Sequence, residues 1–218
     1  MKIAIEGMDG VGKTTIAKKL AEKYNFTYME RPLKELFETD KVDGMTNLMD
    51  MVSTIYSLDD DVLRAWFFGL GNLESFLKHK DEDLVLDRHL ASNYYYNGSE
   101  RSKPVFELMQ EYISVPDITV VLYASNKVRR KRIYKRDKSD FDLKDPKSFA
   151  EDGYKKIIDF LEETNSPYVL IDTENKTIDE VFEEVDSKVQ ARMKELNGNS
   201  YTRKRSDKNA LWNIKDKE

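Results

Sequence analysis

Short apolar runs alternate with longer amphipathic stretches along this chain. The runs cover residues 2–6, 26–30, 84–86, 118–123 and 168–171, and most are bounded by acids, proline or asparagine. Runs of this length with such boundaries are typical of β-strands. They are too uniformly apolar for a sheet with one wetted face, which favours a parallel sheet covered on both sides.

The stretches between the runs have helical periodicity. Apolar side chains recur every four residues over 16–24 and every three or four over 178–189. The second stretch is preceded by Thr177 and has Glu180 three positions later, a capping-box pattern. The pattern as a whole predicts an α/β fold with five parallel strands and helices on both faces.

The length of 218 residues fits one compact domain. We expect this domain to span 1–196, with a charged lid segment at about 126–153 that ends in a loop rich in aspartate. Residues 197–218 contain an Asn-Gly-Asn-Ser sequence and a short basic cluster. They predict a polar C-terminal tail.

Composition narrows the function classes. Lys and Arg total 36 and Asp and Glu total 41, giving a net charge of −5 that disfavours a protein built to coat nucleic acid. The chain has no cysteine, which excludes disulfides and thiolate metal sites and favours a cytoplasmic location. No window approaches the ~18 apolar residues of a membrane span, so no membrane association is expected.

A phosphate-binding motif follows the first predicted strand. Residues 7–14 read Gly-Met-Asp-Gly-Val-Gly-Lys-Thr and match G-x-x-x-x-G-K-[ST] between a strand and a helix. Backbone amides of such a loop surround phosphate oxygens, Lys13 would reach the β and γ phosphates, and the Thr14 hydroxyl would ligate Mg²⁺. The predicted ATP-binding residues are Gly7, Asp9, Gly10, Val11, Gly12, Lys13, Thr14 and Thr15.

A second candidate site follows the third predicted strand, where Asp87 and Arg88 stand side by side. The carboxyl ends of parallel strands surround the ligand crevice, so both side chains should lie near the phosphate loop. Asp87 is suited to orient Mg²⁺ and Arg88 to grip a second phosphate. The simpler alternative is an Asp-Arg ion pair at a strand end.

Taken together, these motifs resemble the thymidylate kinase family. The resemblance rests on Gly-x-Asp-Gly-x-Gly-Lys-Thr-Thr, on Asp-Arg-His-Leu-Ala-Ser-Asn with Tyr96 after it, on Pro-Asp-Ile-Thr at 116–119, and on Gly-Tyr at 153–154 beyond a basic segment. It covers about residues 2–189. It implies transfer of the ATP γ-phosphoryl group to a deoxynucleoside monophosphate, usually dTMP, by a homodimer.

The same resemblance implies roles on the acceptor side. Asp9 would lie near the acceptor sugar and 5′-phosphate, and Arg88 would bind that phosphate. Asn93 would contact the base edge, and Tyr96 would pack on the sugar where a 2′-hydroxyl would clash. An amide matches a pyrimidine edge, and a ring against C2′ penalises ribose.

The predicted base site departs from the family pattern. Phe67 or Phe68 resembles the aromatic residue that stacks on the base, but the arginine commonly found four residues later is replaced by Gly71 or Asn72. The base specificity of the acceptor therefore stays open.

Basic residues crowd the predicted lid helix. Arg129, Arg132 and Arg136 are spaced to share one face. Such a run can be a solvated face or a nucleic-acid contact, but in a phosphate-loop kinase it would neutralise charge on the transferring phosphoryl group. Arg132 and Arg136 are favoured for this role over Arg129 and Arg130. The predicted catalytic set is Asp9, Lys13, Arg88, Arg132 and Arg136.

Two other functions remain open at this stage. A deoxynucleoside kinase must deprotonate a 5′-hydroxyl, and Glu30 at the end of the second strand would be its base. A monophosphate acceptor already presents an anionic oxygen and needs positioning instead. A nucleotide-dependent switch or nucleic-acid-handling module is the third possibility, disfavoured by the net acidity.

Overall fold

A computed structural model describes residues 1–30, 33–37, 43–138 and 147–198 of the chain. Its centre is a five-stranded, fully parallel sheet with the strand order β2-β3-β1-β4-β5. The strands are β1 (Lys2–Gly7), β2 (Thr27–Glu30), β3 (Leu84–Asp87), β4 (Ile118–Tyr123) and β5 (Tyr168–Asp172). These bounds confirm the predicted strands to within a residue, and the α/β fold with them.

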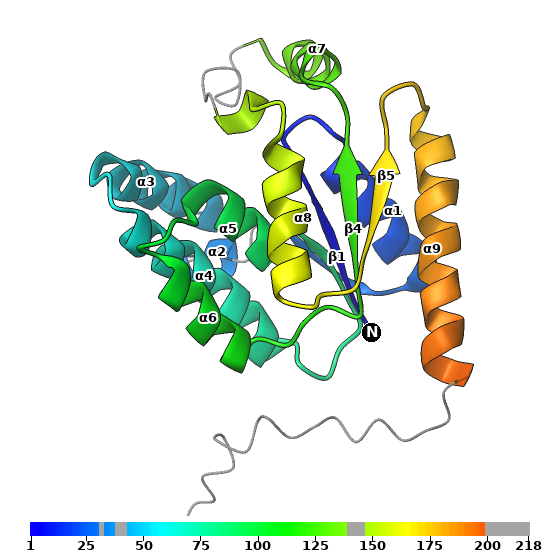
Figure 1. The fold of residues 1–218 in the computed structure, drawn as a ribbon, viewed down its shortest axis with the longest axis horizontal. Helices are drawn as coiled ribbons and strands as arrows, with labels where there is room; N and C mark the ends of the chain where they lie inside the picture. The colour runs from blue at the N-terminus through cyan, green and yellow to red at the C-terminus, as the bar shows by residue number, and fades with distance from the viewer. Residues whose placement is uncertain (31–32, 38–42, 139–146, 199–218) are drawn as a thin grey trace, which may run out of the picture.

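Helices cover both faces of the sheet (Figure 1). They are α1 (Lys13–Tyr24), α2 (Leu33–Leu36), α3 (Gly44–Ser57), α4 (Asp61–Lys78), α5 (Leu90–Asn97), α6 (Lys103–Tyr112), α7 (Asn126–Arg136), α8 (Gly153–Glu163) and α9 (Ile178–Gly198), with the 3₁₀ turn η2 (Lys147–Phe149). Helices α1 and α9 pack together on one face, and α5 and α8 pack on the other. Helices α2, α3, α4 and α6 form a further group outside α5.

The central strand β1 explains why the sheet is parallel. Ile3, Ala4 and Ile5 are completely buried, so both faces of the strand need apolar cover. The strand ends at Gly7, which has φ +134°, and a Cβ there would lie 2.2 Å from the Leu122 carbonyl oxygen. Glycine is therefore required where the chain leaves the sheet and enters the phosphate loop.

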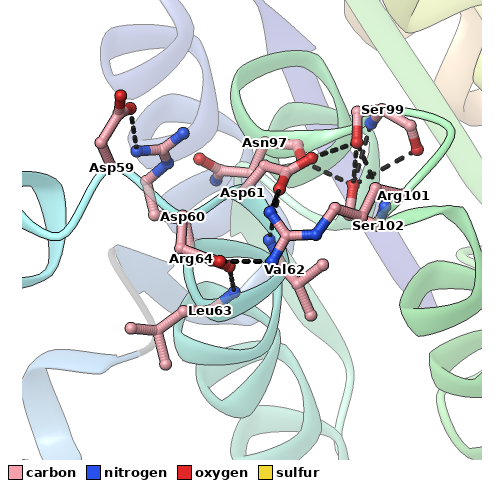
Figure 2. A network of polar contacts seen from close by, with 10 residues as sticks. All are labelled: Asp59, Asp60, Asp61, Val62, Leu63, Arg64, Asn97, Ser99, Arg101 and Ser102. Carbon is pink, nitrogen blue, oxygen red and sulfur yellow. Dashed lines mark hydrogen bonds and ion pairs between the residues drawn. The ribbon is translucent and has the colours of Figure 1, made fainter.

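A polar network fixes the outer helices to the loop between α5 and α6 (Figure 2). Asp60 caps α4 by accepting from the Leu63 amide at 2.8 Å, and it pairs with Arg101. Arg101 also donates to Asp61 at 3.0 Å, and Asp61 accepts from the Ser99 hydroxyl. The start of α4 is thus tied to the chain segment that follows α5.

Within the described residues, no helix is both long enough and apolar enough to cross a bilayer. Helix α9 extends to Gly198, so it includes the first two residues of the predicted tail, Asn197 and Gly198. The remainder of that tail, residues 199–218, lies outside the described residues, as does the aspartate-rich stretch 139–146 of the predicted lid.

The capping box before α9 is confirmed. Thr177 Oγ1 accepts from the Glu180 amide at 3.2 Å, and Glu180 accepts from the Thr177 amide at 2.8 Å. We expect Thr177→Ala to lower the free energy of unfolding by about 1 kcal/mol, because an uncapped helix start leaves amides without partners. Urea denaturation measures this change.

The matched control is Thr54→Ala. Thr54 lies inside α3, where its hydroxyl donates to the Asp50 carbonyl of the same helix at 3.1 Å. Alanine is the better helix former, so this variant should keep or slightly raise stability. Equal losses in both variants would contradict the capping role of Thr177.

Candidate active site

A cavity of about 1040 Å³ opens at the carboxyl ends of the strands. The phosphate loop and the start of α1 line it with residues 9–16, and the other strand ends contribute Glu30, Asp87 and Arg88. The remaining lining residues come from α3, from α7 and the residue after it, and from the start of α9 and the loop before it: 49, 132, 133, 136, 137, 173, 176–178 and 181. The sheet topology explains this convergence, because parallel strands deliver their following loops to one edge.

The phosphate loop has the backbone that its glycines predict. Gly10 and Gly12 have φ of +82° and +102°, and Gly12 faces open space. Lys13 is buried, and its ammonium donates to the Met8 carbonyl at 2.8 Å. Burial lowers the pKa of Lys13 to about 8, the nearby Arg88 charge acts in the same direction, and Asp9 opposes both.

Thr14 and Asp87 meet as the sequence predicts for a metal site. The Thr14 hydroxyl donates to Asp87 Oδ2, and Tyr28 approaches the same oxygen at 3.5 Å. The other oxygen, Asp87 Oδ1, is buried and accepts no hydrogen bond from any described residue. A hydroxyl beside a carboxylate oxygen that lacks a partner suits a hard cation such as Mg²⁺.

Asp9 is the centre of a cluster of polar contacts at the cavity. Its Oδ1 pairs with Arg88 and lies 3.8 Å from the Lys13 ammonium, while its Oδ2 accepts from Tyr96 and, at 3.0 Å, from Ser148. Burial alone would raise the pKa of Asp9, but the charges of Arg88 and Lys13 and the two hydroxyls hold it well below the usual range. Asp9 is therefore an anion at every physiological pH.

Arg88 is held in an unusual backbone conformation. It has φ of +81°, in the left-handed region that non-glycine residues rarely adopt. The completely buried Glu6 accepts from the amides of His89 at 2.8 Å and Ser92 at 3.1 Å, and from the Ser92 hydroxyl. The Ser92 oxygen lies 3.4 Å from the Arg88 guanidinium. This network fixes the turn that points Arg88 toward Asp9.

The predicted lid arginines lie in different places. Arg132 and Arg136 both line the cavity. Arg132 donates to the Thr173 hydroxyl at 2.9 Å and to its carbonyl, which places it against the loop before α9. Arg129, predicted to share their face, is buried and donates to main-chain carbonyls instead, because the start of α7 packs on the phosphate loop.

Four predicted acceptor residues are absent from the described lining of this cavity: Phe67, Phe68, Asn93 and Tyr96. Tyr96 still contacts the site, because its hydroxyl donates to Asp9 Oδ2. Asn93 is buried, and its amide donates to the Ala65 carbonyl of α4 at 3.0 Å. Phe67 and Phe68 pack edge to face, and each also contacts another ring, Phe37 or Tyr56. Their position inside α4, which packs on α5, accounts for this.

Glu30 does line the cavity, at the end of β2 and beside Asp87 in the next strand. Its carboxylate lies 3.6 Å from the Lys18 ammonium, and both side chains are more than a third exposed. The structure therefore brings together Glu30, Asp87, Arg88, Lys13 and the phosphate loop.

Three residues of the site were not predicted from the sequence: Glu6, Ser92 and Ser148. Glu6 gave a usable signal, since a charged residue in an otherwise apolar central strand is buried only when it is paired. Ser148 gave none, because nothing in the sequence brings it to Asp9. His89 does not line the cavity, and burial lowers the pKa of its imidazole to about 4, so it is neutral.

Comparison with known sequences agrees with this geometry. The family model for thymidylate kinase matches residues 5–185. A probable thymidylate kinase of Methanococcus maripaludis strain C7 is 27% identical over 199 residues, covering 84% of this chain and 92% of the relative. A thymidylate kinase of Mycoplasma mobile is 31% identical over 198 residues, covering 80% of this chain and 90% of the relative.

Solved structures share the fold. Deoxyadenosine kinase from M. mycoides with bound dATP aligns with a TM-score of 0.61 at 20% identity, over 87% of this chain and all of that one. Thymidylate kinase from Ehrlichia chaffeensis aligns with a TM-score of 0.55 at 22% identity, over 87% of this chain and 98% of that one. With the family model spanning the phosphate loop, Asp87 and Arg88, and the first turns of α9, the chain belongs to the thymidylate kinase family.

Proposed function

We propose that this protein transfers the γ-phosphoryl group of ATP to a deoxynucleoside monophosphate, with dTMP as the first acceptor to test. One observation carries the proposal: the buried ammonium of Lys13 and the partly exposed guanidinium of Arg88 both lie beside Asp9 Oδ1 at one cavity. Two such cations suit two phosphate-bearing substrates that meet end to end. The relatives named thymidylate kinase support the same acceptor class.

Phosphoryl transfer would then depend on the positions of the two substrates and on neutralisation of their phosphate charge. The acceptor phosphate already carries the attacking anionic oxygen, so no strong general base is needed. The acceptor phosphate would bind Arg88 and replace part of the ion pair between Arg88 and Asp9. Lys13 would bind the donor phosphates. Arg136, which lines the cavity, would approach the transferring group, while Arg132 would act at the donor side near Thr173.

Mg²⁺ is the cofactor that the residues fit. Thr14 and Asp87 would hold it, using the Thr14 hydroxyl and Asp87 Oδ1, which accepts no hydrogen bond from the described residues. In the described part of the chain, no cluster of three or more potential ligands forms a metal site. That suits Mg²⁺, which commonly takes one or two protein ligands together with substrate phosphates. When bound, it would neutralise charge on the donor phosphates.

The test of the function is a direct assay. Purified protein with ATP and Mg²⁺ is offered dTMP, the other deoxynucleoside monophosphates, thymidine and single-stranded DNA in turn, and ADP and phosphorylated product are measured. Turnover of one or more monophosphates is expected. Turnover of thymidine without dTMP would overturn the proposal, and ATP hydrolysis that requires DNA would favour a nucleic-acid-handling role.

A deoxynucleoside kinase is the second candidate, because Glu30 lines the cavity next to Asp87. A carboxylate there could accept the proton of a 5′-hydroxyl. Glu30→Gln separates the two functions. It should abolish turnover of a nucleoside but change turnover of a monophosphate only through acceptor binding.

A homodimer is the expected assembly, and α4 offers the face for a second copy. Leu63, Trp66, Leu70 and Leu77 are 39–49% exposed and recur at spacings of three, four and seven, so they form one apolar stripe. The helix begins with Asp61 and ends with Lys78. Antiparallel pairing of two copies would bury the stripe and place opposite charges at each end.

Arg88→Ala should raise the KM for a monophosphate at least tenfold or abolish turnover, because the acceptor phosphate loses its guanidinium. The KM for ATP should change little. Steady-state kinetics with each substrate varied in turn measures both. The control is Arg192→Ala, whose guanidinium donates to the Asp117 carbonyl at 2.9 Å at the far end of α9. Unchanged acceptor kinetics in Arg88→Ala would remove Arg88 from the acceptor site.

Binding of ATP should weaken as pH rises through about 8. Burial lowers the pKa of Lys13 to about 8, so the ammonium that binds phosphate is lost above that pH. The kcat/KM for ATP, which reports the free enzyme, should fall between pH 7.5 and 9.5. The variant Lys13→Arg keeps its charge, so its ATP affinity by calorimetry should not fall over this range. A flat wild-type profile would contradict the assignment.

Trp66→Glu should convert the dimer to monomer, because a carboxylate in the centre of the α4 stripe cannot be buried against a second copy. Light scattering after size-exclusion chromatography measures the mass. Tyr134→Glu is the control, because Tyr134 is 52% exposed on α7, outside the stripe. A monomeric wild type would rule out the dimer, and a dimeric Trp66→Glu would rule out this face.

A further inference from the structure

Arg129 is a buried cation whose hydrogen bonds all go to the main chain. Its exposed fraction is 1%, and its guanidinium donates to the carbonyls of Ala124 at 3.2 Å, Asp9 at 3.3 Å, Ala150 at 3.2 Å and Ser148. These carbonyls come from three separate parts of the chain. One guanidinium therefore joins the end of β4, the phosphate loop and the segment 147–150.

The cost of burying such a group is high. Without a carboxylate hydrogen-bonded to it among the described residues, Arg129 gains less than an ion pair would give, and burial lowers its pKa. An apolar side chain of similar size would fill the space more cheaply. The guanidinium supplies directional hydrogen bonds, because its N–H donors lie in one plane and fix the relative positions of the three segments.

The segment 147–150 is held on its other sides as well. The Tyr95 hydroxyl donates to the Lys147 carbonyl at 2.6 Å, and the Lys147 ammonium donates to the Tyr96 carbonyl at 2.6 Å. The amide of Asn126 donates to the Phe149 carbonyl at 2.7 Å. The segment is thus a bridge between α5, which carries Tyr96, and α7.

Ser148 projects from this bridge onto Asp9. It is 1% exposed, and its hydroxyl donates to Asp9 Oδ2 at 3.0 Å. The Tyr96 hydroxyl donates to the same oxygen, while Arg88 pairs with Oδ1. The two hydroxyl donors fix the position of Oδ2. They therefore oppose a rotation of the carboxylate, which would move Oδ1 away from Arg88.

We propose that Ser148 is a positioning residue for the acceptor site, and that Arg129 acts through it by holding the segment 147–150 against the phosphate loop. Ser148 fixes the orientation of the Asp9 carboxylate. Asp9 in turn fixes the orientation of the Arg88 guanidinium, which would receive the acceptor phosphate. The proposal rests on the proposed function, since it assigns a role within that same site.

Ser148→Ala tests the first step. Removing the hydroxyl leaves Oδ2 with one donor, so the KM for the monophosphate should rise about tenfold, the size expected for a hydrogen bond to a charged group. The KM for ATP should stay within about twofold, because Lys13 and the loop amides are untouched. Steady-state kinetics with each substrate varied in turn measures the split.

Ser102→Ala is the matched control. Ser102 is also buried, and its hydroxyl donates to the Asn97 carbonyl at 2.8 Å instead of to Asp9. Thermal unfolding should show comparable losses of stability in the two serine variants. A rise in the acceptor KM of both would mean a general loss of structure and would overturn the positioning role.

A double-mutant cycle tests the step from Arg129 to Ser148. Arg129→Met should raise the acceptor KM, and adding Ser148→Ala should raise it little further, because both changes remove the same restraint. Independent, multiplying effects would overturn the link. If Arg129→Met does not fold, Arg129→Lys replaces it, since a point charge cannot reach all four carbonyls.

The activity of the wild-type protein distinguishes failure of this proposal from failure of the proposed function. Absence of transfer to every monophosphate would overturn the proposed function. Normal transfer in the wild type with an unchanged acceptor KM in Ser148→Ala would overturn the positioning role alone.

Discussion

The pairing of Asp9 with Arg88 is the interaction on which the site depends. Burial makes the Asp9 charge costly by itself, and the partly exposed guanidinium of Arg88 offsets that cost only in the right geometry. Much of the surrounding structure supports that geometry: Glu6 fixes the backbone around Arg88, while Tyr96 and Ser148 fix the carboxylate. A substrate phosphate would replace part of an existing ion pair, and the Arg88 guanidinium is already oriented to receive it.

The fold could be predicted because its determinants are local. Five apolar runs gave five strands, the glycines of residues 7–12 gave the phosphate loop, and Thr177 with Glu180 gave the start of α9. Each of these features depends on residues close together in the sequence. The strand order β2-β3-β1-β4-β5 was not predicted, because no local motif specifies which strands are neighbours in the sheet.

The site could be predicted only in part, and the reason is physical. Residues at strand ends, such as Asp87 and Arg88, are placed by the sheet itself, and both line the cavity. Residues within helices are placed by helix rotation and packing, which the sequence does not fix. Asn93 turned toward α4, Phe67 and Phe68 packed among other rings, and Arg129 was buried while Arg132 and Arg136 stayed at the cavity.

Asp9 belongs to two structures at once, the loop that surrounds the donor phosphates and the wall that holds Arg88. A change at this position cannot alter one substrate without altering the other. Selection for a new acceptor would therefore be expected to spare Asp9 and act on other side chains that line the cavity, such as Glu30 at the end of β2. Asp9 and the loop that carries it would be constrained by both nucleotides, whereas residues that contact only the acceptor could change more freely.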